Sequence, residues 1–237
     1  MKTDSADRLL AGVDLDAIVK KSLRGSGVPA QIDESYVAQP KTYSQVSERV
    51  SQKTKGAHDM LYNGYIEALN KTSAELDTVD RAGAGPNKSA FRDLKLAETF
   101  NANAVWLHEL YFANCFDPHS EIYMDTKAYM RIERDWGTFD DWQRDFVACC
   151  MSAREGWAVM GYSMQLRRYI NTLIDGHSEG TMLGLYPIVV LDVWSHAYYR
   201  DYLTDRSSYV MAQMQELNWQ VIEERMARAE KIAEALK

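Results

Sequence analysis

The stretch LDVWSHAYY, residues 191–199, is the part of this chain that decides its fold. It directly follows the apolar run YPIVV (186–190) and places Asp192 four positions ahead of His196, with bulky aromatic residues around both. A chain that leaves a buried strand normally enters turn residues, so a carboxylate and an imidazole here need an explanation. Either the pair forms a hydrogen-bonded structural corner, or both side chains bind a metal ion.

Three short segments have the composition of β-strands. They are GWAVMGYS (156–163), RRYINTLI (167–174) and LYPIVVLD (185–192), each rich in β-branched and aromatic residues and bounded by glycine or polar turns. Because only MQL separates the first two segments, we expect an antiparallel sheet of three strands.

Two long helices are predicted ahead of these strands. Apolar periodicity indicates one helix over about 51–78, with His58 on its apolar face, and another over about 90–116, with His108 on its apolar face. A modest loop joins the two, so we expect them to pack as an antiparallel hairpin.

Shorter helices are expected around the sheet. One begins near residue 123, a second follows with Thr138 or Asp140 as its N-cap, and helical periodicity returns over about 198–237. The fold class is therefore α+β, an N-terminal α-helical hairpin followed by an α/β domain with a three-stranded antiparallel sheet. We divide the chain into an N-terminal extension (1–35), a helical hairpin domain (36–118) and a C-terminal α/β domain (119–237).

Composition narrows the class of protein. The 237 residues carry a net charge of −7 with a pI near 5.3, which disfavours nucleic acid or an anionic membrane as a partner. Cys115, Cys149 and Cys150 are too few for a disulfide framework and are not spaced as a cysteine zinc site. No run approaches the roughly 20 apolar residues of a membrane span, and we expect a cytoplasmic protein.

The histidines are the candidate metal ligands. The chain has five of them: His58, His108, His119, His177 and His196. Any one alone is best interpreted as a buried imidazole that hydrogen-bonds to a backbone carbonyl. His58, His108 and His196 nevertheless lie with Asp192 at the expected junction of two subdomains. Three imidazoles and one carboxylate form a ligand set that suits iron, manganese or zinc. Spacing alone leaves the structural and the metal-binding interpretations open, and His119 is expected at the surface.

Five motifs carry a family resemblance. LDVWSHAYYRDY (191–202) resembles the Asp-Val-Trp-Glu-His-Ala-Tyr-Tyr signature of the iron/manganese superoxide dismutases. HDMLYNGYIEALNK (58–71) and FNANAVWLHELYFANCF (100–116) resemble the two helices that carry ligand histidines in that family. GWAVMGYS resembles the strand with the active-site tryptophan, and RSSYVMAQMQELNW (206–219) resembles the C-terminal elements. The motifs run in family order and cover about residues 36–226.

The resemblance implies a site and a reaction. The implied ligands of one Fe or Mn ion per chain are His58, His108, Asp192 and His196. The implied neighbours are Tyr65 at the substrate entrance, Trp157 as a wall of the pocket, Trp106 and Trp194 as further lining, and Tyr199 as a hydrogen-bonding residue across a dimer interface. The implied activity is dismutation of superoxide to dioxygen and hydrogen peroxide by a homodimer.

The first ligand helix departs from the family pattern. Many members place the tyrosine eight residues after the ligand, whereas Tyr65 follows His58 by seven. An ungapped register fixed on Tyr65 would put Ala57 at the ligand position. We favour His58, because an offset of seven is about two helical turns and keeps both side chains on one face.

Two further departures concern hydrogen bonds around the site. The family's usual glutamine, which hydrogen-bonds the solvent molecule on the metal, is missing. Ala104 occupies the position that supplies it in one subgroup, and His177 falls where another subgroup carries it. We therefore assign to His177 the hydrogen bond to the metal-bound solvent. Ser195 replaces the family's glutamate, which reaches the partner subunit, so a charge-assisted hydrogen bond of about 1.5–3 kcal/mol is lost. The homodimer then either persists through Tyr199 and apolar contacts or is weakened.

Two alternative functions are considered. A protein of this fold without activity could act as a structural or assembly subunit, which Ser195, the extension and the offset of His58 favour and the intact ligand quartet opposes. A zinc hydrolase with the same quartet is the weakest alternative, because hydrolytic zinc sites usually have three protein ligands with an acid/base residue nearby.

Overall fold

The computed structural model describes residues 38–44, 46–115 and 120–236. The expected N-terminal extension (1–35) and His119 lie outside these residues, as does the boundary predicted at 118/119. The described elements, in chain order, are α3 (Gln52–Thr78), α4 (Ala90–Cys115), α5 (Lys127–Trp136), α6 (Phe139–Ser152), β1 (Gly156–Ser163), β2 (Arg168–Asp175), β3 (Leu185–Asp192), α7 (Ser195–Tyr202), α8 (Arg206–Gln215) and α9 (Trp219–Ala235).

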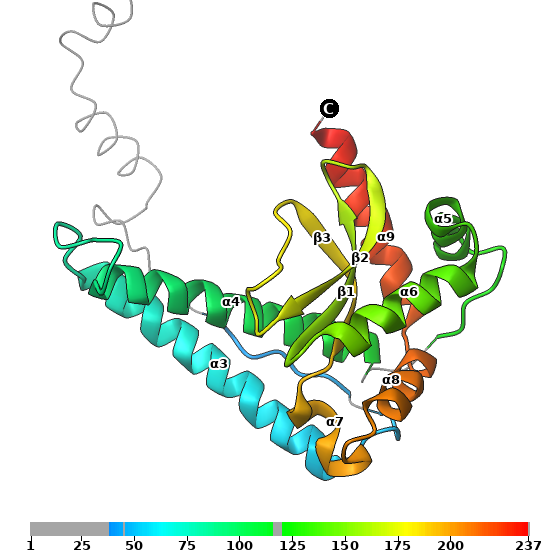
Figure 1. Cartoon of the computed structure of the whole chain (residues 1–237), viewed down its shortest axis with the longest axis horizontal. Helices are drawn as coiled ribbons and strands as arrows, with labels where there is room; N and C mark the ends of the chain where they lie inside the picture. The colour runs from blue at the N-terminus through cyan, green and yellow to red at the C-terminus, as the bar shows by residue number, and fades with distance from the viewer. Residues whose placement is uncertain (1–37, 45, 116–119, 237) are drawn as a thin grey trace, which may run out of the picture.

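The two long helices form the expected hairpin (Figure 1). Helix α3 begins after Ser51, whose hydroxyl accepts a hydrogen bond from the backbone N–H of Thr54 at 3.3 Å and thereby caps the helix. Helix α4 runs back along α3 and continues beside β3, so the hairpin and the sheet share one apolar core.

The sheet has the strand order β2-β1-β3 and is antiparallel throughout, which confirms the predicted fold class. Strand β1 lies in the middle and is buried along its whole length. Its register against β3 pairs Trp157 with Asp192. Because cross-strand partners are close neighbours, this pairing brings the start of β1 beside the end of β3.

Helix ends in the second half follow local capping. The Thr138 side chain accepts from the backbone N–H of Asp141 and begins α6, so the first of the two predicted N-caps is correct. The start expected near residue 123 is several positions too early, because Thr126 caps α5 and the helix begins at Lys127. The predicted C-terminal helical stretch is three separate helices, and the first break falls at Leu203, which has a φ of 53°.

The core joins both halves of the described structure. The largest fully buried side chains come from the hairpin, α6 and the sheet, among them Tyr111, Trp142 and Trp157. No helix in the described ranges combines the length and apolar character needed to cross a bilayer. Several of the buried polar and charged residues, among them His58, His108 and Asp192, converge on one site.

Candidate metal centre

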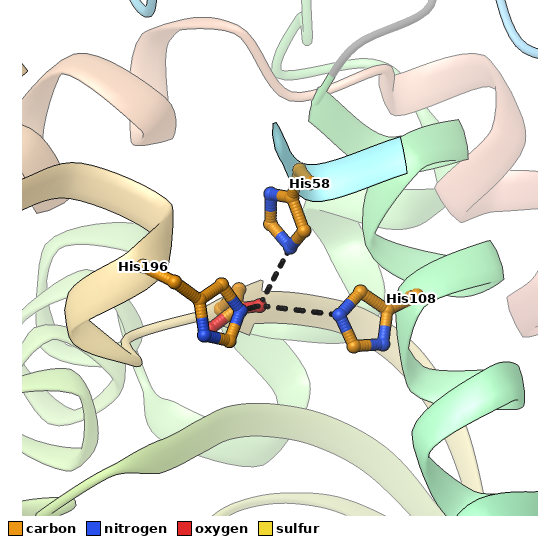
Figure 2. Close-up of side chains that lie close together, drawn as sticks. His58, His108 and His196 are labelled. Atoms are coloured by element: carbon orange, nitrogen blue, oxygen red, sulfur yellow. Dashed lines mark hydrogen bonds and ion pairs between the residues drawn. The ribbon is translucent and has the colours of Figure 1, made fainter. Parts of the chain in front are cut away.

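Four side chains from four elements of the fold meet at one point (Figure 2). His58 comes from α3, His108 from α4, Asp192 from the end of β3 and His196 from the first turn of α7. Each offers one ligand atom, and these atoms all lie within 4.8 Å of one another. The Oδ2 of Asp192 lies 3.0 Å from Nε2 of His58, 3.2 Å from Nε2 of His196 and 3.9 Å from Nε2 of His108.

Helix geometry orients the two histidines of the hairpin. His58 is fully buried and lies on the face of α3 that turns toward the site. The Nδ1 of His108 donates a hydrogen bond to the carbonyl of Ala104, one turn earlier on α4, at 2.6 Å. With the proton on Nδ1, the lone pair of Nε2 points into the cluster. The structure thus places His58, the residue favoured over Ala57 from the sequence, in the cluster.

The carboxylate of Asp192 is held by the backbone around it. Its Oδ1 accepts from the backbone N–H of Trp194 at 2.8 Å, which leaves Oδ2 to face the histidines. The hydroxyl of Tyr209 donates to the backbone carbonyl of Asp192 at 2.8 Å, and the hydroxyl of Tyr111 lies 3.0 Å from that of Tyr209. This buried tyrosine pair was not predicted from the sequence, although Tyr111 lies on the apolar stripe of its helix and Tyr209 lies within the motif at 206–219.

Burial and charge set the protonation of the four groups. Burial lowers the pKa of His58, and it lowers the pKa of His108 to about 3, so both rings are neutral near pH 7. Burial opposes ionisation of Asp192, but His196 and His58 outweigh it and hold the pKa of that carboxyl well below its usual range. Burial likewise opposes the charged form of His196, yet Asp192 and then Glu155 raise the pKa of His196.

The donor set fits a metal ion. Within the described part of the chain, the buried Nε2 of His108 has no hydrogen-bond partner, which is costly unless an ion occupies its lone pair. Two ligands on opposite sides of an ion at about 2.0–2.2 Å are separated by about 4.0–4.4 Å, close to the 4.8 Å spread of these atoms. Three imidazoles and a carboxylate suit iron, manganese or zinc.

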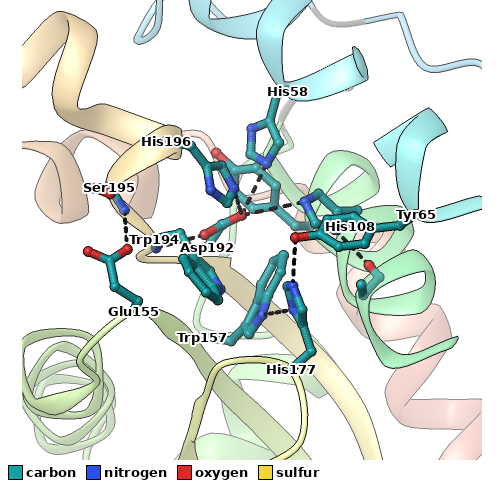
Figure 3. Close-up of polar contacts among 12 residues, drawn as sticks. His58, Tyr65, His108, Glu155, Trp157, His177, Asp192, Trp194, Ser195 and His196 are labelled. Carbon is teal, nitrogen blue, oxygen red and sulfur yellow. Dashed lines mark hydrogen bonds and ion pairs between the residues drawn. The ribbon is translucent and has the colours of Figure 1, made fainter. Parts of the chain in front are cut away.

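A second row of side chains runs past the cluster (Figure 3). The indole N–H of Trp157 donates to Nδ1 of His177 at 3.0 Å, and Nε2 of His177 lies 3.1 Å from the hydroxyl of Tyr65. Because an indole only donates, Nδ1 must accept, so Nε2 carries the proton and donates to Tyr65. The chain of contacts therefore leaves the hydroxyl proton of Tyr65 free to be donated onward.

These outer groups are also shifted in pKa. Burial lowers the pKa of His177 to about 4, so this ring is a neutral donor near pH 7. Burial, aided by the charge of Asp192, raises the pKa of Tyr65, which keeps its proton. The amide of Asn103 on α4 donates to the backbone carbonyl of His177 at 2.8 Å and fixes the loop that carries it.

The aromatic surroundings match the expectation in part. The ring of Trp157 packs edge-on against His108, and the ring of Trp194 stacks against both His177 and His196. Trp106 does not join them: it is 52% exposed and lines a surface groove with Leu69, Ser73, Glu98, Thr99, Ala102 and Asn103. Tyr199 is 54% exposed on α7 and lies outside the cluster, as a surface residue.

Comparisons with known proteins give one consistent result. Residues 124–225 match the family model described as the C-terminal domain of iron/manganese superoxide dismutases. An Fe superoxide dismutase of Aquifex pyrophilus is 36% identical over 179 residues, which is 74% of this chain and 83% of the relative. One from Cupriavidus metallidurans, also named as Fe, is 33% identical over 170 residues, 71% and 83%. A Mn superoxide dismutase of Haloarcula marismortui is 29% identical over 182 residues, 76% and 87%.

Proposed function

The chain belongs to the iron/manganese superoxide dismutase family, and we propose that His58, His108, Asp192 and His196 hold one Fe or Mn ion at which superoxide is dismuted. The reaction converts two superoxide anions and two protons into dioxygen and hydrogen peroxide. The observation that carries the proposal is the convergence of four ligand atoms around the unpartnered Nε2 of His108.

The bound ion would supply the one-electron redox cycle, in which one superoxide is oxidised and the next is reduced. Three neutral imidazoles and one carboxylate leave the ion with a net positive charge, which attracts an anionic substrate. Relatives named as Fe and as Mn enzymes match this chain, and both metals accept this ligand set. The hydrogen bonds around the ligands therefore determine which of the two metals supports activity.

The outer residues have distinct tasks in the proposal. Trp157 fixes the tautomer of His177, and His177 donates to Tyr65, which keeps the Tyr65 hydroxyl proton directed away from His177. A proton on that hydroxyl can be delivered to the product of superoxide reduction, which needs two. The rings of Trp157 and Trp194 pack against the ligand histidines and exclude bulk water from them.

Metal analysis of the purified protein, combined with xanthine-oxidase-coupled superoxide scavenging before and after chelation, tests this function. Iron or manganese with scavenging that chelation abolishes supports the enzyme. A protein without bound metal would instead indicate the structural subunit, and zinc without scavenging would indicate the hydrolase. A His108→Ala variant provides the site control, because it removes the ligand whose Nε2 has no other partner.

Assembly and location are further parts of the proposal. A homodimer is supported by the exposed Tyr199 on α7 and by Leu203 directly after that helix, which are 54% and 63% exposed. A reducing compartment such as the cytoplasm is supported by Cys115, Cys149 and Cys150, which are all free. Light scattering of the wild type and of a Tyr199→Ala variant tests the dimer, since loss of the contact would lower the measured mass.

A further inference from the structure

The helix that carries His196 begins without a cap of its own. Helix α7 starts at Ser195, and its N-cap residue, Trp194, offers no side-chain hydrogen bond to the free N–H groups of the first turn. Such groups need acceptors when they are part-buried. His196 is also the least shielded ligand, with a side chain 23% exposed where those of His58 and Asp192 are fully buried.

A carboxylate from 40 residues earlier in the sequence supplies the missing acceptor (Figure 3). The Oε2 of Glu155, the residue just before β1, accepts from the backbone N–H of Ser195 at 2.7 Å. A negative group at the N-terminus of a helix is favoured by the helix dipole as well as by the hydrogen bond. The neighbour of Ser195 in the chain is the ligand His196, so the contact fixes the turn that presents this ligand.

The backbone of Glu155 is anchored on the other side of the site. Its carbonyl accepts from the N–H of Gly176 at 2.7 Å, and Gly176 directly precedes His177. Next to it, the carbonyl of Gly156 accepts from the N–H of Val193 at 2.9 Å. Glu155 therefore contacts the residue beside His177 through its backbone and the residue beside His196 through its side chain.

The negative charge of Glu155 interacts with the ligand His196. No lysine or arginine in the described ranges lies within ion-pair distance of its carboxylate, and its negative charge acts on His196. Groups behind a ligand orient it and tune the metal. A negative charge there stabilises the more positive, oxidised state of an ion.

From these contacts we propose that Glu155 is a positioning residue for the metal centre, which holds the first turn of α7, and with it His196, and which adds a negative charge behind that ligand. The inference rests on the metal site proposed above. It assigns to Glu155 two separable effects: one depends on a hydrogen-bond acceptor at this position, and the other depends on its charge.

The test compares Glu155→Ala, which removes acceptor and charge, with Glu155→Gln, which keeps an acceptor oxygen. The matched control is Asp135→Ala, because the carboxylate of Asp135 also accepts a backbone N–H from another element, that of Tyr169 at 2.7 Å, at the far end of β1 and β2. Three properties are measured: hydrogen exchange of the metal-free protein, Mn²⁺ affinity by competition with a chelator, and the midpoint potential of the loaded protein.

We expect Glu155→Ala to speed exchange in the first turn of α7 and to weaken Mn²⁺ binding by about 10–100-fold. We expect Glu155→Gln to keep the affinity within about threefold but to raise the midpoint potential, since the charge is gone. Unchanged exchange and affinity in Glu155→Ala, or equal losses in Asp135→Ala, would overturn the positioning role. An unchanged potential in Glu155→Gln would overturn the charge effect. If the wild type binds neither Mn²⁺ nor Fe²⁺, the proposed function itself fails and this inference with it.

Discussion

The substitution His177→Ala separates metal binding from turnover. His177 makes two hydrogen bonds, from Trp157 at 3.0 Å and to Tyr65 at 3.1 Å, and its side chain is completely buried. It is not one of the four converging ligands. We therefore expect the variant to bind a full complement of Fe or Mn while it loses activity.

The cost in stability follows from the contacts. Loss of two neutral hydrogen bonds costs about 1 kcal/mol each, and the indole N–H of the fully buried Trp157 is left unpartnered, which adds about 1–3 kcal/mol. We expect a loss of about 3–5 kcal/mol in the free energy of unfolding of metal-free His177→Ala at pH 7. Loss of the group that orients the proton donor Tyr65 is expected to lower turnover by about 10²–10⁴-fold and to shift the midpoint potential.

The difference in stability between wild type and His177→Ala also depends on pH. In the folded protein the pKa of His177 is lowered from 6.5 to about 4, so between these values the unfolded chain binds more protons and stability rises with pH. The contribution of His177 to the free energy of unfolding is complete above about pH 6.5 and is lost as the pH falls toward 4. At about 1.4 kcal/mol per pH unit the whole shift is worth at most about 3.5 kcal/mol, of which about 2 kcal/mol is lost between pH 7 and pH 4.5.

Urea denaturation of the metal-free wild type and of His177→Ala at pH 7 and pH 4.5 measures both effects. The deficit of the variant should narrow by most of 2 kcal/mol at the lower pH, because only the wild type loses the His177 contribution. His177→Gln serves as a control that retains a donor and an acceptor but does not titrate. Unchanged turnover in a fully metal-loaded His177→Ala protein would remove His177 from the mechanism, and a deficit that does not change with pH would refute the protonation argument.

Three other substitutions test separate parts of the structure. Asp192→Ala should abolish Fe and Mn binding, because three neutral imidazoles then lack their common anionic partner; stoichiometric metal by mass spectrometry would contradict this. Tyr65→Phe should keep the metal, lose about 1 kcal/mol in urea denaturation and lower turnover at least about 10-fold, and full turnover would exclude Tyr65 as proton donor. Arg225→Ala removes buried charged hydrogen bonds to Asn114 and Ile188 and should cost about 3–5 kcal/mol, whereas a cost below about 1 kcal/mol would show that they contribute little.

Local patterns were enough to place most elements. Strands β1 and β3 have the predicted bounds, and Thr138 begins α6 as one of two predicted caps. Strand composition, helix periodicity and capping act over a few residues, so they can be read along the chain. The start of α5 was predicted too early, near residue 123, although its cap at Thr126 is an equally local signal.

The four candidate ligands could also be named from the sequence, but the choice of metal binding over a structural role came from motifs that resemble a family. Spacing alone left a structural corner as an equal explanation for Asp192 and His196. The family pattern in turn left Ala57 as a competitor of His58 when the register was fixed on Tyr65. In the structure, His58 reaches Asp192 across 134 residues of sequence at 3.0 Å. That distance depends on how α3, α4 and β3 pack together.

The tertiary structure alone decided the finer contacts. It put Trp106 in an exposed groove and Trp157 beside the ligands, although both are tryptophans in quoted motifs. It fixed the tautomer of His177 through the indole of Trp157, and it placed the carboxylate of Glu155 at the start of α7. The physical reason is that propensity and periodicity are properties of neighbouring residues. Hydrogen-bond partners and burial depend on which distant surfaces pack against each other, and a single sequence does not state this.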